Sequence, residues 1–418
     1  MVRPVFILSA WPVCCVVGCA GPVYNVIDLG SLGGASSAFA VNASGEAAGV
    51  SRNAAGYNHA MLFNNGVFTD LTAGTGAMEG QASGINSAGQ VAGTAFNASG
   101  QAMATVWSNG PRGLGTLGGS NSYATAINAR GDVVGQAQTA SGEGHAFLDA
   151  GGTMHDLGTF DGGWSSAYAV DSLDQVAGYG MTASGAFHAF LWSAAAGFED
   201  LGTLGGRNSY AMGINDSGQV VGNSMLANGI SHAFLYTGSQ LLDLGSPGGA
   251  SYAYSINNSG EIAGYYTLAN GASRAFLDAN GVMLDLNSLL SPGSGWVLME
   301  AYGINDSGEI AGAGWYQGQL HAFLAVDPPE SVPEPGTPGL LAVGFGAALL
   351  SRQRLKQMIP VRRRHSRMPA YIVAPRDLPA IAAEILRNVA AVSETEHDVV
   401  VLGGMRQAKR VAGFMQTG

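Results

Sequence analysis

Short apolar segments separated by turn residues recur along most of the chain, and their order repeats about every 43 residues. Each copy begins with Ala, has a small residue two positions later, and continues with Val or Ile followed by Asn or, once, Asp. The initial alanines are Ala38, Ala82, Ala124, Ala167, Ala211, Ala253 and Ala301. A fixed period of roughly 20 to 50 residues is typical of solenoids and propellers, so the pattern predicts seven similar units.

Each unit contains four segments with the length of short strands. The first ends in a turn such as 215–218, Asn-Asp-Ser-Gly, where Gly218 supplies the positive φ that a tight hairpin requires. In the fourth unit Asp174 takes this place. A second strand follows the turn, a third carries His-Ala-Phe-Leu, as at 188–191, and a fourth carries Asp-Leu, as at 200–201. Four strands in each of seven units predict an all-β, seven-bladed β-propeller, with an open β-solenoid as the alternative.

The two ends of the repeat region favour a closed ring. The seventh unit stops after 322–324 without an Asp-Leu strand, and the missing strand occurs at 23–29, before the first unit. We therefore expect the N-terminal strand to complete the seventh blade and to remove an exposed sheet edge. The small residues of the first strand are expected nearest the axis, where the blades converge. The seventh unit is longer than the others, and we expect the extra segment near 288–297 to project from one face.

The repeat resembles the HAF repeat family, through its His-Ala-Phe, Asp-Leu-Gly-Thr-Leu-Gly-Gly and Ile-Asn-x-x-Gly motifs. The resemblance covers about residues 23–326. It implies an extracellular or surface location and transfers no chemistry.

Both ends of the chain read as processing signals. Residues 1–20 have one charge, an apolar run and small residues before a cleavage point, as in a signal peptide, and Cys19 also stands where a lipobox cysteine would be acylated. Residues 328–356 contain Val332, Pro333, Glu334 and Pro335, then an apolar run at 339–350, then a basic cluster. This order resembles the PEP-CTERM sorting signal, which implies a C-terminal hydrophobic helix, a sorting protease and the membrane as partners during export.

The expected domains are thus the signal peptide 1–20, the propeller 21–327, the sorting signal 328–356 and a basic tail 357–418. Members of the sorting family normally end soon after the basic cluster, so the tail departs from their pattern. Within the tail, 371–374 and 398–402 read as strands and 378–392 as a helix, which together form a small α/β fragment.

Charge is distributed unevenly along the chain, and this distribution argues against nucleic acid as a partner. Residues 1–351 hold 6 Arg, no Lys and 24 Asp or Glu, whereas the remainder holds 12 Lys or Arg against 5 acids. Nucleic-acid binding depends on Lys and Arg that neutralise phosphates, so we expect no nucleic-acid partner for the acidic part. All three Cys lie in the first twenty residues, which leaves the propeller without a disulfide framework or a Cys-based metal site.

Histidine recurs at one repeat position in five units, as His59, His145, His188, His232 and His321. Catalysis or metal binding would require these side chains to converge, but a ring places one in each blade. We instead predict a structural pair between each His and the Asp of the fourth strand, with Asp28 serving His321 across the closure. The Asn-Asp-Ser-Gly turns lack the spaced carboxylates of a calcium loop, so no metal and no cofactor are expected.

Residues that break the repeat are the remaining candidates for a binding surface. Asp161, Trp164, Trp296 and Glu300 combine aromatic rings, which stack on sugar faces, with carboxylates, which accept hydroxyl hydrogens. No pair is spaced as a general acid and base, so we predict no catalytic residue and no enzyme activity. The predicted function is an exported cell-surface or extracellular-matrix protein with a structural and ligand-binding role. The alternative is a carbohydrate-binding or carbohydrate-acting propeller with an extracellular polysaccharide as partner.

Overall fold

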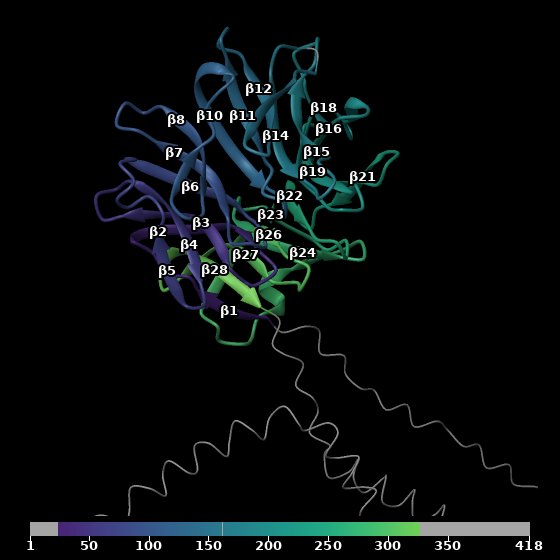
Figure 1. Ribbon diagram of the computed structural model, residues 1–418. Helices are drawn as coiled ribbons and strands as arrows, with labels where there is room; N and C mark the ends of the chain where they lie inside the picture. The colour runs from purple at the N-terminus through teal and green to yellow at the C-terminus, as the bar shows by residue number, and fades with distance from the viewer. Residues whose placement is uncertain (1–23, 161, 327–418) are drawn as a thin grey trace, which may run out of the picture. The chain divides into compact units, whose positions relative to one another are not determined.

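The computed structural model describes residues 24–160 and 162–326, which form seven four-stranded antiparallel sheets. The sheets follow one another around a central axis, and the chain runs through them in order (Figure 1). In six sheets the four strands are consecutive in sequence. This arrangement confirms the predicted seven-bladed β-propeller.

The strands fall into four concentric groups. The inner strands are β2 (Gly33–Val41), β6 (Glu79–Ile85), β10 (Gly118–Ile127), β14 (Ser165–Val170), β18 (Gly205–Ile214), β22 (Ser251–Ile256) and β26 (Trp296–Ile304). The second strands are β3 (Ala47–Asn53), β7 (Val91–Phe96), β11 (Val133–Thr139), β15 (Val176–Met181), β19 (Val220–Leu226), β23 (Ile262–Thr267) and β27 (Ile310–Tyr316). Each inner strand contacts the inner strands of both neighbouring blades, which places the predicted small residues beside the axis.

The third strands carry the His-Ala-Phe segments. They are β4 (Asn58–Asn64), β8 (Ala102–Trp107), β12 (Gly144–Ala150), β16 (Phe187–Ser193), β20 (Ser231–Tyr236), β24 (Ser273–Ala279) and β28 (Gln319–Val326). The outer strands are β5 (Val67–Asp70), β9 (Pro111–Gly113), β13 (Thr153–Gly158), β17 (Gly197–Gly202), β21 (Leu241–Gly245), β25 (Val282–Asp285) and β1 (Asn25–Asp28). One 3₁₀ helix, η1 (Leu286–Leu289), follows β25.

The N-terminal strand closes the ring, as predicted. Strand β1 pairs antiparallel with β28, and Asn25 lies opposite Val326 while Asp28 lies opposite Phe323. Beyond the strand, Leu29 donates a backbone hydrogen bond to Ala322 O at 3.1 Å and is 2% exposed. Leu29 packs in a cluster that joins the seventh blade to the first, so the same segment supplies both a ladder and a core contact.

Asparagine side chains build the hairpin turns at the end of the inner strands. Asn42 Oδ1 accepts hydrogen bonds from the backbone N–H groups of Ser44 and Glu46, both at 3.0 Å. Gly45 follows at φ +73°, a conformation that a side chain would strain. The requirement for a short carbonyl-bearing side chain and a residue in the left-handed region explains why this part of the repeat is so uniform.

The Phe of the His-Ala-Phe segment forms the centre of a blade. Phe190 lies opposite Gly178 of the second strand and is fully buried. A Cβ at Gly178 would meet Ser166 O at 2.2 Å and the Phe190 ring at 2.8 Å, so only glycine fits. The described residues form seven buried clusters, each shared by two neighbouring blades. Burial between blades is therefore the main source of stability.

Serine hydroxyls link most neighbouring blades. Ser165 Oγ donates to Gly158 O at 2.6 Å and accepts from the Ala146 N–H at 2.8 Å. Both partners belong to the preceding blade, and equivalent serines are Ser36, Ser122, Ser209 and Ser251. These contacts explain why Ser recurs two positions before the initial Ala of the repeat.

The extra segment of the seventh unit is only partly packed inward. Leu289 and Leu290 lie on a core cluster beside the fully buried Leu286, whereas Pro292, Gly293 and Val297 are exposed. Tyr24 donates its backbone N–H to Leu289 O at 2.7 Å, so the segment also holds the start of the closing strand. The leucines of the insertion gain more by covering the apolar edge of the last joint than by facing water, while its Pro and Gly residues stay at the surface.

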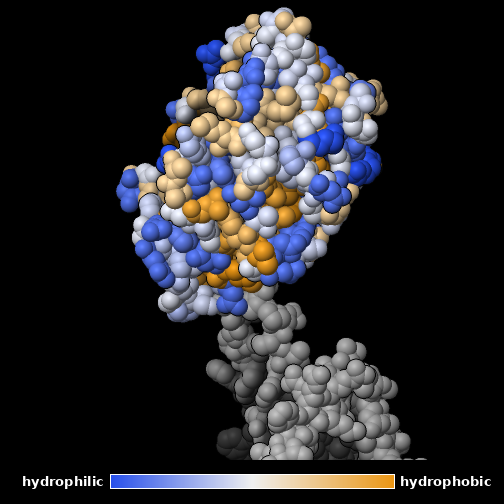
Figure 2. Space-filling model, turned by 60° about the vertical axis from the view of Figure 1, so that its left-hand side comes forward, coloured by the Kyte–Doolittle hydropathy of each residue, from blue (hydrophilic) through white to orange (hydrophobic). Residues whose placement is uncertain are grey.

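Several predicted features lie outside the described residues, namely the signal peptide with Cys19, Asp161, the sorting signal and the tail 357–418. Within 24–160 and 162–326, no helix is long and apolar enough to cross a membrane. Figure 2 shows one face of the described body, on which hydrophobic and hydrophilic residues are interspersed.

Candidate functional site

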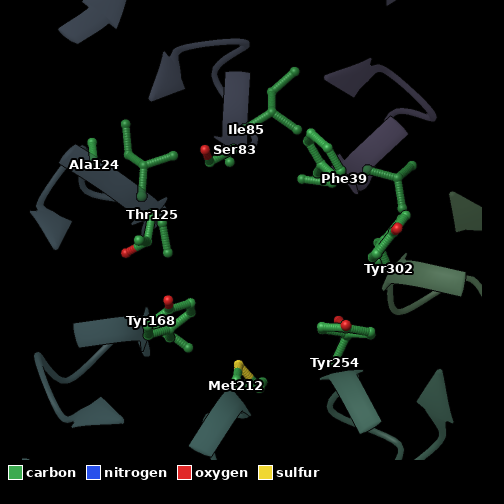
Figure 3. A pocket seen from close by; sticks show the side chains of 18 of the residues that line it. Phe39, Ser83, Ile85, Ala124, Thr125, Tyr168, Met212, Tyr254 and Tyr302 are labelled. Carbon is green, nitrogen blue, oxygen red and sulfur yellow. The ribbon is translucent and has the colours of Figure 1, made fainter. Parts of the chain in front are cut away.

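A β-bulge in every inner strand sets the direction of one side chain per blade. In β2 the register passes from Ala38, opposite Gly49, to Ala40, opposite Ala48, so Phe39 is an extra residue without a partner. All seven inner strands shift in this way between the initial Ala and the small residue. Bulges re-aim side chains, and here the extra residue turns toward the axis (Figure 3).

The seven bulge residues surround an axial channel. They are Phe39, Ser83, Thr125, Tyr168, Met212, Tyr254 and Tyr302, which comprise five residue types although the residues on either side repeat. The channel has a volume of about 510 Å³. This size lies within the usual range for small-molecule sites, roughly 300 to 1,000 Å³.

One wall of the channel is aromatic. The rings of Tyr254 and Tyr302 have centroids 5.2 Å apart, and Phe39 meets Tyr302 edge-on at 5.2 Å. These three side chains come from the sixth, seventh and first blades, and the smaller Ser83 and Thr125 lie across the opening (Figure 3). The asymmetry gives the channel one side rich in aromatic rings and another side with the small hydroxyl residues Ser83 and Thr125.

None of the residues that line the channel carries a charge. Outside this lining, the acid Glu300 accepts a hydrogen bond from the Tyr302 hydroxyl. Burial, followed by this hydrogen bond and the charge of Glu300, raises the pKa of Tyr302. Burial and the charge of Glu300 likewise raise the pKa of Tyr254 to about 12. Because the pKa values of both Tyr302 and Tyr254 are raised, these two side chains stay protonated at neutral pH and offer hydroxyl groups to a neutral ligand.

The two ends of the channel differ. One end of the channel is lined by a collar of Val and Ile residues, which consists of Val41, Ile85, Ile127, Ile214, Ile256 and Ile304. A second, polar cavity of about 240 Å³ lies beyond the collar among the Asn turns. At the opposite end Gln81 and Tyr123 are exposed, so we take this end as the entrance.

The repeated histidines form the predicted structural pairs. The Nδ1 atoms of His145, His188, His232 and His321 lie 2.9 Å from the carboxylates of Asp156, Asp200, Asp243 and Asp28, and His59 lies 2.8 Å from Asp70. Each pair occupies its own blade, and no group of His, Cys, Asp and Glu within the described ranges is arranged to hold a metal ion. The sixth blade has Arg274 at the His position, and its equivalent acid, Asp285, accepts a hydrogen bond from the Tyr266 hydroxyl at 3.2 Å instead.

The ligand candidates chosen from the sequence have different surroundings. Trp296 is 8% exposed and stacks on Tyr316 with centroids 4.6 Å apart, which favours a packing role. Trp164 is half-buried against Tyr179, at 5.4 Å, and Phe187. Tyr179 in turn stacks on the channel residue Tyr168, so Trp164 is connected to the channel wall through one ring. The structure thus groups Glu300 and Trp164 with the channel and leaves Trp296 in the core.

Sequence reasoning missed the bulge residues. Their signal was present, because one position varies freely within a segment where every neighbour is restricted to a few residue types. Variation there is the expected mark of a position that faces a ligand rather than the shared core. It was overlooked because the repeat was read through its uniform columns.

No family model matches this chain, and no curated protein matches it. Among solved structures, the chain is similar to the β-propeller domain of the Trilobed protease from Pyrococcus furiosus, with 11% identity over 71% of this chain and 96% of that one and a TM-score of 0.49. It is also similar to TolB from Acinetobacter baumannii, with 11% identity over 65% and 77% of the two chains and a TM-score of 0.40. For the BP39L lectin from Burkholderia pseudomallei, identity is 9%, coverage 73% and 99%, and the TM-score 0.38.

Proposed function

We propose that this protein is an exported β-propeller of the cell surface or extracellular matrix that binds a small uncharged ligand in its axial channel. The observation that supports the binding role is the set of seven bulges, which aim seven side chains of five residue types into one uncharged channel. A scaffold with no ligand would have no need to vary this position while keeping its neighbours constant.

The export role rests on the sequence. Residues 1–20 resemble a signal peptide, the repeats resemble the HAF family, and Val332 to Pro335 with the following apolar run resemble a PEP-CTERM signal. Mass spectrometry of the cell-associated protein tests this part. A mature N-terminus near residue 21, or an acylated Cys19, supports export. Retention of both residues 1–20 and 357–418 on a cytoplasmic protein would refute it.

Carbohydrate binding is the second candidate function. A sugar ring has an apolar face that stacks on an aromatic side chain and hydroxyl groups that need neutral hydrogen-bond partners. The channel offers both, through the Tyr254 and Tyr302 wall and the facing Ser83 hydroxyl (Figure 3). No enzymatic step is proposed.

A glycan array and a library of uncharged small molecules, probed with the full chain, test the site. We expect Tyr254→Ala to weaken binding at least about fivefold, which corresponds to about 1 kcal/mol. The matched control is Tyr57→Ala, because Tyr57 is 38% exposed and lies outside the channel lining. Sugar binding that Tyr254→Ala abolishes would select the carbohydrate function. Binding that survives Tyr254→Ala and Tyr168→Ala would place the site elsewhere and refute the channel.

A further inference from the structure

A ring of asparagine side chains joins the blades at the turn end of the axis. In each case Asn Nδ2 donates to the main-chain oxygen of the equivalent residue in the next blade. The links run from Asn42 to Asn86 at 2.9 Å, Asn86 to Asn128 at 3.2 Å, Asn128 to Asp171 at 3.1 Å, Asn215 to Asn257 at 3.0 Å, Asn257 to Asn305 at 3.1 Å, and Asn305 back to Asn42 at 2.8 Å. Six of the seven joints between blades are therefore linked in one way.

The seventh joint, between the fourth and fifth blades, begins at Asp171. Its Oδ1 accepts from the N–H groups of Leu173 and Gln175, both at 2.8 Å, as Asn Oδ1 does in the other turns. Its Oδ2 consequently takes the place of the Asn Nδ2 atom. This oxygen is buried and has no hydrogen-bond partner, and Asp171 is only 3% exposed. By analogy with the six Asn links, the acceptor for a donor at this position is Asn215 O, and an ionised carboxylate would leave Oδ2 as an unsatisfied buried polar group.

Two neighbouring carboxylates, Asp174 and Asp216, disfavour the ionised form of Asp171. Asp174 lies in the same turn, and Asp216 belongs to the turn of the fifth blade, where it accepts from the Ser172 N–H at 2.9 Å. From the third blade, Arg130 pairs with Asp174 and with Asp132. Burial is the main cause that raises the pKa of Asp171, with smaller contributions from Asp216 and Asp174, against the lowering effect of its two backbone hydrogen bonds. Asp171 also borders the polar turn-end cavity, through which a proton can reach it.

We propose that Asp171 carries a proton in the folded protein and that its Oδ2–H group donates to Asn215 O, which completes the ring of seven links. The joint between the fourth and fifth blades is then sensitive to pH. A group whose pKa is higher in the folded than in the unfolded state contributes stability below its unfolded pKa, and that contribution is lost as the pH rises through the folded pKa. The link therefore forms in acid and opens in alkali, unlike the six Asn links, which do not titrate.

The test compares thermal unfolding of the full chain between about pH 4.5 and 8.5 for the unaltered protein, Asp171→Asn and Asn86→Asp. Asn86 is the matched control, because its turn has Gln90 where that of Asp171 has Gln175. We expect Asp171→Asn to match the unaltered protein at the acidic end and to unfold about 2 to 4 °C higher at the alkaline end. Asn86→Asp should show an additional fall in unfolding temperature as the pH rises, because it introduces a second titratable link.

Three results would overturn the proposal. A difference between Asp171→Asn and the unaltered protein that does not change with pH would show that Asp171 does not titrate in this range. A lower unfolding temperature for Asp171→Asn at the alkaline end would show that the ionised carboxylate is stabilised, for instance by the Gln175 amide. If calcium raised the unfolding temperature of the unaltered protein but not of Asp171→Asn, the carboxylate would be a cation ligand.

Infrared difference spectra give a direct measurement. They should show the carbonyl band of a protonated carboxyl group, and Asp171→Asn should remove this band.

Discussion

The imidazole Nδ1 of His321 lies 2.9 Å from a carboxylate oxygen of Asp28, although 293 residues separate them in the chain. The same pair occurs within single blades, for example between His188 and Asp200. In the seventh blade it connects the last described strand to the first. The His–Asp hydrogen bond, which is local in the other blades, is thus a long-range contact that helps to close the ring.

The pair should contribute a modest coupling energy. We expect a double-mutant cycle of His188→Leu and Asp200→Asn to give about 0.5 to 1 kcal/mol, because both side chains are partly exposed and the charges are screened by water. The measurement is chemical denaturation of the two single variants and the double variant. Strict additivity would show that the His–Asp hydrogen bond does not stabilise the blade.

Closure of the ring should depend on Leu29. Replacement by Ala removes a side chain that is 2% exposed in the cluster between the seventh and first blades, so we expect a loss of about 2 to 5 kcal/mol in unfolding free energy. Ile27→Ala is the control on the same segment, since Ile27 is 40% exposed, and it should cost far less. Equal losses of unfolding free energy for the two variants would mean that only the backbone hydrogen bonds between β1 and β28 hold the segment.

The second-strand glycines should tolerate no side chain. A Cβ at Gly222 would lie 1.9 Å from Tyr210 O and 3.0 Å from Ala211 Cα, and neither backbone atom can withdraw without breaking the ladder. We expect Gly222→Ala to destabilise the protein by at least about 2 kcal/mol. Gly113→Ala, where the nearest atom is the flexible Met103 side chain at 3.2 Å, is the control. Similar unfolding midpoints for the two variants would contradict this explanation.

Trp296 should act on stability rather than on ligand binding. Its ring is stacked on Tyr316 and contacts Phe323, so Trp296→Ala is expected to cost about 3 to 5 kcal/mol. Ligand affinity of the folded fraction should stay unchanged, in contrast to Tyr254→Ala. Calorimetric titration with a ligand found on the array checks both variants. Loss of ligand affinity in a fully folded Trp296→Ala protein would show that Trp296 takes part in ligand binding.

Burial of Asp278 should give this side chain a contribution to stability that is lost as the pH rises. Desolvation raises the pKa of Asp278, which is 2% exposed, and its hydrogen bond from the Gly281 N–H only partly opposes this shift. Because the folded pKa is the higher one, its contribution is lost as the pH rises through that value. Unfolding temperatures measured from about pH 4.5 to 8.5 should fall less steeply for Asp278→Asn. An unchanged slope would show that Asp278 keeps an ordinary pKa.

Local rules in the sequence were sufficient for the blade. Asn-x-x-Gly turns, the Gly beside the buried Phe and the His–Asp pair each depend on residues that are close in the chain or opposite each other in one hairpin, and all of them repeat. Repetition also made closure predictable, because the strand absent after Leu324 was present before Gly30. These features follow from hydrogen bonding and steric fit between neighbouring strands.

The channel and the Asp171 joint were decided only by the tertiary structure. The direction of Tyr254 depends on a bulge in its strand, and its meeting with Tyr302 and Phe39 depends on the angle between three blades. In the same way, the sequence shows Asp171 as a single exception to the Asn of the other turns, but not that its Oδ2 is buried without a hydrogen-bond partner at the joint to the fifth blade. Side chains that converge from separate blades are set by how the sheets pack against one another, and no periodicity along the chain encodes that distance.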